Sequence, residues 1–434
     1  MPVSSPSKEL TIKQRYLKLA VLVIVAGNIY PLIYLRQNFE ISIVDAFGIT
    51  SAQLNQNYVW LGIIYMITYV PSGWLADRVS PRVLMSFSLL FAGLLGVWFS
   101  SLPSPESLRL IFIGWGLAAG LTFWSALIKA TALLARPEEQ GRFFGILDGG
   151  RGFVEAILAS IAVAMFAYYT NGVGGDTPDA LVKVIWLYVG MMLLLAPISY
   201  FILGAPESQS EPLKGITKDQ KGKAFALFLS DISSVIAKPE IWLCAFCIMT
   251  GYQLFWATYS FSAYMQTEFG LTAVAVGSIT VAKLWMRPIG AASAGFAGDF
   301  LNREKVLAVL MLLASLALAV LAFVPVSIGA MFLLAIVLVI GFLTYAVRGI
   351  FWATLESCNV SNNVKGLAIG LISLIGYSPD VYLPLLNNFL LELYPGKAGY
   401  AIYYNIIAGM GILGALAAWR LKHIVAARSD APGV

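Results

Sequence analysis

Long apolar stretches separated by short polar segments follow one another along most of the chain. A hydrocarbon core roughly 30 Å thick is crossed by about 20 apolar residues in an α-helix, and the stretches have this length. The pattern predicts an all-α membrane protein with twelve transmembrane helices in two six-helix bundles. We expect these helices at residues 17–45, 55–76, 83–101, 108–134, 143–169, 184–204, 240–263, 273–294, 306–324, 328–355, 364–391 and 399–421.

One long polar segment, residues 205–239, separates the two sets of six. It is rich in lysine and reads as a cytoplasmic linker, with an amphipathic helix at about 225–236. The expected organisation is therefore an N-terminal six-helix bundle at 1–204, the linker at 205–239, and a C-terminal bundle with a basic tail at 240–434.

The placement of basic residues predicts the orientation in the membrane. Of the 28 Lys and Arg residues, six lie well inside the expected helices. Of the other 22, which lie in loops, in the tails or at helix ends, three fall on one side of the membrane and 19 on the other. Because basic loops stay in the cytoplasm, we expect both termini there, with the chain in the plasma membrane, the inner membrane of a bacterium.

Three short motifs recur in the same order in both halves. They lie 222, 228 and 225 residues apart, which points to a duplicated six-helix unit with a substrate path where the copies meet. The pairs are Gly73-x-x-x-Asp77 with Gly295-x-x-x-Asp299, Phe123-Trp124-x-x-Leu127 with Phe351-Trp352-x-x-Leu355, and Gly141-x-x-x-Gly145 with Gly366-x-x-x-Gly370.

The composition argues against several other classes of function. The chain is 59% hydrophobic and 12% charged, and its net charge of +5 is explained by cytoplasmic loops rather than by nucleic-acid binding. Its only histidine, His423, lies in the basic tail, so we expect no metal site and no cofactor. The three cysteines are interpreted as small core residues, and redox or metal chemistry is the alternative.

The loop after the second expected helix resembles the signature of the major facilitator superfamily. The pattern Gly-x-Leu-x-Asp-Arg-x-x-x-Arg is present as Gly73, Leu75, Asp77, Arg78 and Arg82. The resemblance implies the fold of this superfamily, two six-helix bundles that move a solute by alternating access. A weaker copy, with Asp299 and Arg303, lies at the equivalent place in the second half.

These loop residues are expected to act in gating rather than in substrate binding. A glycine lets two helices approach closely, and an acidic side chain beside a helix terminus can form an ion pair that latches one side of the carrier. The alternative is a solvated turn with positive-inside charges. The gating set comprises Gly73, Asp77, Arg78, Arg82, Asp299, Arg303, Arg151 and Arg348.

Within the superfamily, Tyr34-x-Arg36-x-Asn38-Phe39 resembles the first helix of the organophosphate:phosphate antiporters. That resemblance implies that Arg36 faces the central cavity and binds the substrate anion. The alternative places Arg36 at the lipid headgroups. This chain departs from the family in the seventh helix, where Phe255 and Trp256 stand in place of a second phosphate-binding arginine.

Charged residues inside the expected helices are the main site candidates, because a charge in the bilayer costs several kcal/mol without a partner or a wet cavity. Lys283 and Arg287 are four residues apart on the eighth helix, share a face, and would repel one another without an anion or carboxylate between them. Alternatively, Arg287 latches this helix to another one.

Carboxylates provide possible counter-ions and proton carriers. On the fifth helix, Arg151 can meet Asp148 at i+3 and Glu155 at i+4 and so neutralise the cluster. Asp380 follows Pro379, which opens the eleventh helix locally, and it is a candidate for proton titration or for pairing with a basic residue.

The expected function is secondary active transport of a small organic anion, either a sugar phosphate, a sugar acid or a sulfonate. Proton symport or exchange of another anion would drive it. Tyr34, Tyr252 and Tyr377 join Arg36, Lys283 and Arg287 in the expected substrate site. A transporter-like receptor for such a solute is the alternative. No enzyme motif is found, and a monomer embedded in the lipid bilayer is expected.

Overall fold

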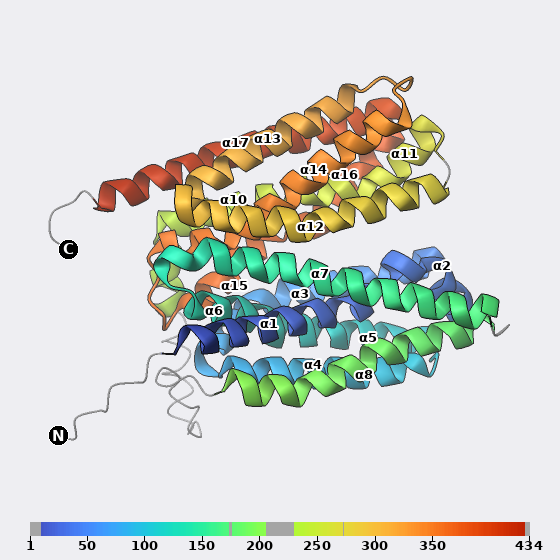
Figure 1. The fold of residues 1–434 in the computed structure, drawn as a ribbon, viewed down its shortest axis with the longest axis horizontal. Helices are drawn as coiled ribbons and strands as arrows, with labels where there is room; N and C mark the ends of the chain where they lie inside the picture. Colours follow the sequence, from blue (N-terminus) through green and yellow to red (C-terminus); the bar gives the residue numbers. More distant parts are fainter. Residues whose placement is uncertain (1–9, 173–175, 205–229, 272, 430–434) are drawn as a thin grey trace. The chain divides into compact units, whose positions relative to one another are not determined.

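A computed structural model of the chain describes residues 10–172, 176–204, 230–271 and 273–429. The regular structure of these residues is entirely helical, which confirms the expected all-α fold (Figure 1). Most of the expected linker, residues 205–229, lies outside the described part. Of the amphipathic helix expected at 225–236, residues 230–236 are described, and they are helical.

The described residues up to position 204 form eleven helical elements. They are α1 (Ile12–Ile33), α2 (Arg36–Phe47), α3 (Ser51–Arg78), α4 (Pro81–Ser100), α5 (Pro105–Gly116), η1 (Leu117–Trp124), α6 (Ser125–Leu134), η2 (Pro137–Glu139), α7 (Gln140–Ala167), η3 (Tyr168–Gly172) and α8 (Thr177–Leu203).

The described residues from position 239 onward form ten. They are α10 (Pro239–Trp256), η4 (Ala257–Ser260), α11 (Phe261–Phe269), α12 (Ala273–Leu301), α13 (Arg303–Phe323), α14 (Ala330–Ile350), η5 (Phe351–Cys358), α15 (Lys365–Gly376), α16 (Pro379–Leu393) and α17 (Lys397–Ser429).

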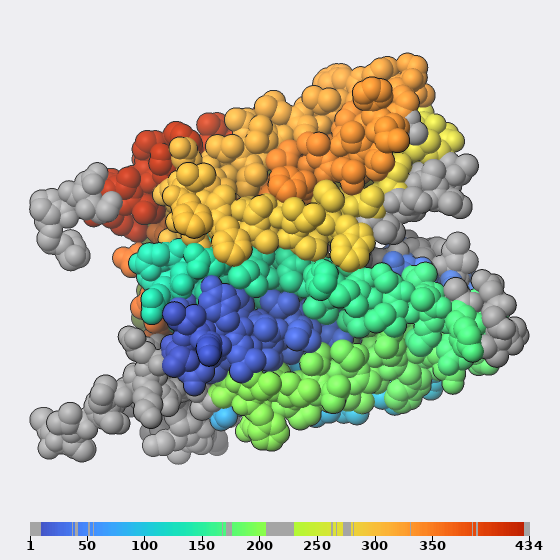
Figure 2. All heavy atoms as spheres, in the orientation of Figure 1, coloured from blue at the N-terminus to red at the C-terminus, as the bar shows by residue number. Residues whose placement is uncertain are grey.

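The described residues hold 11 helices that are long and apolar enough to cross a membrane. A further helix, α12, lies where the sequence predicts the eighth span. Large apolar side chains point outward from many of these helices, for example Phe201 on α8, which is 77% exposed. Figure 2 shows α8 (green) and α14 (orange) at the surface. Such side chains are stable in contact with lipid, so the chain is an integral membrane protein.

Two expected spans are broken where proline or a turn interrupts the helix. The span predicted at 17–45 is not continuous: α1 contains Pro31 and ends at Ile33, and α2 begins at Arg36. The eleventh span also divides, since α15 ends at Gly376 and α16 begins at Pro379, as the proline predicts.

Helical geometry also changes at both copies of the Phe-Trp motif. Phe123 and Trp124 end the π-helix η1, and Phe351 and Trp352 begin the 3-10 helix η5. Irregular turns of this kind often occur at functional sites. Both copies of the Phe-Trp motif therefore lie in irregular helical segments.

The described chain forms two compact units. The first unit comprises residues 1–135, 157–235 and 361–370, and the second comprises 136–156, 236–360 and 371–434. This division does not follow the sequence order, because α7 and α15 each have residues in both units. The sequence-based domain boundaries stay predictions.

Long helix pairs form the framework of each unit (Figure 1). In the first unit, α4 packs along α8. In the second unit, α13 packs along α17 and α12 along α14. Their contact faces carry small side chains, which allow close helix approach in a bilayer where the hydrophobic effect does not drive association.

Glycines of α7 permit its closest contact with α12 in the second unit. A Cβ added at Gly145 would stand 2.7 Å from the carbonyl oxygen of Ala291 and 2.8 Å from Cα of Gly295. Gly73 of α3 faces Gly366 of α15 in the first unit in the same way. The repeated glycine pairs of the sequence are thus helix-crossing points.

We predict that Gly145→Val destabilises the carrier, because the side chain enters the space of the α12 backbone. Overpacking of this kind costs about 1–3 kcal/mol. Gly190→Val is the matched control, since a Cβ there meets nothing within 4 Å. Thermal unfolding in detergent should show a lower midpoint for Gly145→Val only; equal midpoints for the two variants would show that the crossing is not close.

Candidate functional site

Arg36 lies at the break between α1 and α2 in the first unit. It is the first residue of α2, and its guanidinium carbon stands 4.8 Å from the centre of the Tyr58 ring on α3. The Tyr34 ring stacks on the same tyrosine at 5.8 Å. The two residues predicted from the first span are therefore brought together around Tyr58, which the sequence pattern did not single out.

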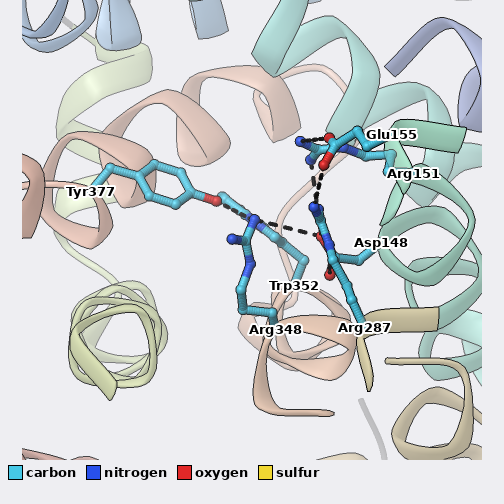
Figure 3. Close-up of polar contacts among 7 residues, drawn as sticks. All are labelled: Asp148, Arg151, Glu155, Arg287, Arg348, Trp352 and Tyr377. Carbon is cyan, nitrogen blue, oxygen red and sulfur yellow. Dashed lines mark hydrogen bonds and ion pairs between the residues drawn. The ribbon is translucent and has the colours of Figure 1, made fainter. Parts of the chain in front are cut away.

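A buried network of charges lies in the second unit, centred on Arg287 of α12 (Figure 3). Its Nη2 donates to Oδ1 of Asp148 at 2.9 Å, and its Nε donates to Oδ2 of the same carboxylate at 3.3 Å. Its Nη1 donates to Oε2 of Glu155 at 2.6 Å. This arginine thus has two carboxylate partners on α7, and its side chain is only 6% exposed.

Two further arginines surround Asp148. Arg151 approaches Asp148 at 4.0 Å and Glu155 at 3.6 Å, which confirms the i+3 and i+4 pairs predicted for α7. Arg348 of α14 approaches Oδ1 of Asp148 at 3.6 Å. We call these five residues, Asp148, Arg151, Glu155, Arg287 and Arg348, the charge cluster.

The packing of small residues makes the charge cluster possible. A Cβ added at Gly152 would lie 2.6 Å from Cδ of Arg287, so the glycine leaves room for the arginine stem between α7 and α12. The cluster holds three cations and two carboxylates. One positive charge is therefore left without a full counter-ion inside the cluster.

Asp380 lies beside the charge cluster, at the first turn of α16. Its Oδ1 accepts a hydrogen bond from the Tyr252 hydroxyl at 2.7 Å and another from Nε1 of Trp256 at 2.9 Å. The Tyr377 ring meets Tyr252 edge-on at 4.8 Å. The structure thus joins three predicted residues, Asp380, Tyr252 and Tyr377, in one aromatic-walled region.

Two aromatic residues that the sequence analysis assigned no role extend this region. Nε1 of Trp352 donates to the Tyr377 hydroxyl at 2.9 Å. Phe255 carries the guanidinium of Arg348 over its ring at 4.2 Å. Phe255 stands where the resembling antiporters have an arginine, and here an arginine of α14 lies over it instead.

Lys283 occupies a different environment one turn before Arg287. Its Nζ donates to the Thr258 hydroxyl at 2.9 Å and to the Thr258 carbonyl at 3.4 Å, and the Phe261 ring lies 5.9 Å away. The residue is 7% exposed. Within the described ranges no carboxylate comes within ion-pair distance of it, unlike Arg287 on the same helix.

The acidic residues of the loop motif and of its copy bind the ends of helices and are not part of the charge cluster. In the first unit, Asp77 accepts from the backbone N–H groups of Gly366 and Leu367 at 2.8 and 2.9 Å, and Lys129 pairs with it at 2.5 Å. In the second unit, Asp299 accepts from the N–H of Arg142 at 2.9 Å. Both copies therefore bind the N-terminal turn of a helix, where the dipole favours a carboxylate.

The remaining basic residues of the motif bind nearby. Arg78 pairs with Asp231 at 3.3 Å, Arg82 lies over the Tyr200 ring at 4.9 Å, and Arg303 donates to the Pro137 carbonyl at 2.7 Å. Among the residues with assigned positions, no group of three metal-ligating side chains was found. All three cysteines are buried.

These observations join a membrane-spanning fold, a duplicated loop motif and a buried site of charges. A family model for the Major Facilitator Superfamily matches residues 21–384. The chain belongs to the major facilitator superfamily. Its membership explains the paired glycine crossings and the two carboxylates that bind helix ends, since both lie in the loop signature and its copy.

Three proteins of Escherichia coli (strain K12) resemble this chain over most of its length. Inner membrane protein YihN is 26% identical, over 93% of this chain and 94% of its own. Inner membrane protein YqcE is 28% identical, over 92% of each chain. Membrane sensor protein UhpC is more distant, at 21% identity over 69% of this chain and 68% of its own.

Solved superfamily structures share the fold at low identity. The human organic anion transporter MFSD10 aligns with a TM-score of 0.69 and 12% identity, over 94% of this chain and 100% of its own. The E. coli fucose:proton symporter FucP aligns with a TM-score of 0.67 and 15% identity, over 93% and 98%. At these identities the likeness concerns the fold alone.

We predict that Arg287→Gln strongly destabilises the second unit. Removing one partner of a buried ion pair costs about 3–5 kcal/mol, because Asp148 would stay charged and lose its two strongest hydrogen bonds. The double variant Arg287→Gln with Asp148→Asn should recover part of the loss in thermal unfolding. Arg109→Gln, at an exposed arginine, is the control. A double variant no more stable than the single one would contradict the pairing.

Proposed function

We propose that this membrane transporter moves a small organic anion by alternating access, coupled to a proton or to an exchanged anion. A sugar phosphate, a sugar acid and a sulfonate are the candidate classes. Family membership supports solute transport across a membrane. The anionic character of the solute is our proposal, and it rests on the cations buried in the membrane-spanning helices.

The observation that carries the proposal is the contrast between Lys283 and Arg287. Arg287 has Asp148 and Glu155 as counter-ions, whereas Lys283, among the residues that the structure describes, donates only to Thr258. Burying an ammonium group without a carboxylate partner costs free energy, and an anion that binds to the group lowers this cost. A residue of this kind favours the anion-loaded carrier over the empty one, which is what a substrate ligand does.

The first unit contains another cation that we assign to substrate binding. Arg36 lies at a helix break, beside Tyr34 and Tyr58, on a span that resembles the substrate-binding helix of the organophosphate:phosphate antiporters. We assign Arg36 and Tyr34 to the substrate. Tyr252 and Tyr377 are assigned to it in the second unit, where they lie next to Asp380.

We assign the coupling of transport to a proton or to an exchanged anion to the carboxylates. Asp380 is held by two hydrogen-bond donors and lies near the charge cluster, so it is suited to be a counter-ion or a proton carrier. Asp148 and Glu155 serve as counter-ions of Arg287. In the gating assignment, Arg151 and Arg348 join the loop motif residues Gly73, Asp77, Arg78, Arg82, Asp299 and Arg303.

We propose a bacterial inner-membrane location with both termini in the cytoplasm and a monomeric carrier. The names of the two E. coli relatives support the location, and the excess of basic residues on one side supports the orientation.

A second candidate function is sensing without transport. It is favoured by the similarity to Membrane sensor protein UhpC. A sensor binds the same anion and changes conformation, but the anion does not accumulate behind the membrane. Binding without uptake in the experiment below would select this function.

We predict that proteoliposomes containing the chain accumulate at least one anion from a panel of a hexose phosphate, a hexuronate and a sulfonated hexose. Uptake is measured with and without an inward proton gradient, and with each unlabelled anion inside. Stimulation by the gradient indicates symport, and stimulation by internal anion indicates exchange. If the wild-type carrier neither binds nor accumulates any of these anions, the proposal is wrong.

Removal of the buried amine should abolish this uptake. We expect Lys283→Met to lower the initial rate about tenfold or more, as the loss of one charge-assisted hydrogen bond implies. Lys183→Met, at an exposed lysine of α8, is the matched control and should keep the wild-type rate. Arg36→Ala tests the first unit in the same assay. Unchanged rates in both site variants would remove the assignment of these cations to the substrate.

A further inference from the structure

Arg348 is a largely buried arginine whose guanidinium donates no hydrogen bond to the residues that the structure describes. Its side chain is 11% exposed, and its Nε is fully buried. Among the same residues, the guanidinium contacts the Asp148 carboxylate at 3.6 Å and the Phe255 and Tyr252 rings at 4.2 and 5.8 Å. A guanidinium has five N–H donors, and buried donors are normally paired.

The carboxylate nearest to Arg348 is already engaged. Both oxygens of Asp148 accept hydrogen bonds from Arg287, at 2.9 and 3.3 Å. Arg348 therefore gains only electrostatic attraction from it. The contact with the face of Phe255 stabilises the cation but offers no acceptor to its N–H groups.

The described neighbours of the Arg348 guanidinium are two aromatic rings and one carboxylate. In Figure 3 the arginine extends between the Trp352–Tyr377 pair and the Asp148–Arg287 pair. The side chain is thus held by aromatic packing in an extended position. A planar fork that is fixed in this way binds a carboxylate, phosphate or sulfonate through two parallel hydrogen bonds.

Asp380 adds a requirement for the rest of the ligand. Its Oδ1 accepts from Tyr252 and Trp256, while its Oδ2 has no hydrogen-bond donor among the residues that the structure describes. It also interacts electrostatically with Arg348. A bare anion at Arg348 would be repelled by this carboxylate, whereas a hydroxyl group on the same ligand would donate to Oδ2.

We infer that Arg348 binds the oxyanion group of a hydroxylated organic acid, and that Asp380 Oδ2 accepts a hydroxyl hydrogen of the same molecule. This inference rests on the proposed transport of an organic anion and names its chemistry more closely. It gives Arg348 a direct role in binding, in addition to its assignment to gating, and it makes Asp380 a residue that selects hydroxylated anions.

The binding test uses the purified full-length carrier and sodium glucuronate as the hydroxylated anion. Thermal unfolding is followed against glucuronate concentration at constant ionic strength, with sodium hexanoate as the anion without hydroxyls and glucose as the neutral solute. We expect stabilisation by glucuronate only. For Arg348→Gln the half-saturating glucuronate concentration should rise about tenfold or more, and for Arg348→Lys it should rise less, because a lysine keeps the charge without the fork.

A comparison with Arg287→Gln distinguishes a role of Arg348 in ligand binding from a role in stability. Without ligand, it should lower the unfolding midpoint far more than Arg348→Gln does, because Arg287 loses three hydrogen bonds and Arg348 loses none. Asp380→Asn should bind hexanoate and glucuronate with similar affinity, since the repulsion and the strong acceptor are both removed. These results together would support the inference.

Two outcomes overturn the inference: an Arg348→Gln carrier with the wild-type half-saturating concentration, or a wild-type carrier that glucuronate does not stabilise. The proposed function fails separately. If glucuronate binds through Arg348 but neither it nor the panel anions accumulate in proteoliposomes, transport is wrong and the inference stands. If uptake occurs and is insensitive to Arg348→Gln, transport stands and the inference is wrong.

Discussion

Neutralisation of buried charge inside an apolar helical protein is the constraint on which the second unit depends. A bilayer offers no water to a guanidinium, so each buried arginine must find its counter-ion on a neighbouring helix. Arg287 finds Asp148 and Glu155 on α7, and the contact exists only because Gly145 and Gly152 let α7 approach α12 and its arginine. Helix packing and electrostatics are thus one arrangement, because the glycines determine which charges can meet.

The same constraint separates structural cations from functional ones. Arg287 donates three hydrogen bonds to two carboxylates, so it serves as part of the framework. Lys283 is buried and Arg348 is largely buried, but among the described residues Lys283 donates only to Thr258 and the Arg348 guanidinium donates to none. Buried cations with few hydrogen-bond partners lower the stability of a protein, and in the function that we propose the binding of an anionic solute offsets this cost.

Much of this picture was readable from the sequence, and the limits have physical causes. Hydropathy gave the helices, and a single helix fixes the geometry of Arg151 with its neighbours at i+3 and i+4, so those pairs were predicted correctly. Pairs between helices were not, because Arg287 and Asp148 are 139 residues apart and meet through tertiary packing. The same holds for Thr258 beside Lys283 and for Phe255 beneath Arg348. The break before Arg36 was missed, since Pro31 alone does not tell a kink from the end of a helix.

Direct observation of an anion in the second unit would test the account most directly. Crystals of the carrier grown with a bromine-substituted sugar acid, which keeps hydroxyl groups beside its carboxylate, allow the anion to be located by the anomalous scattering of bromine. We predict that the acid binds with its carboxylate on the Arg348 guanidinium, and that its bromine peak is lost in crystals of Arg348→Gln. Sugar acid bound only at exposed basic loops, and not beside Arg348 or Lys283, would contradict the claim that these cations serve an anionic solute.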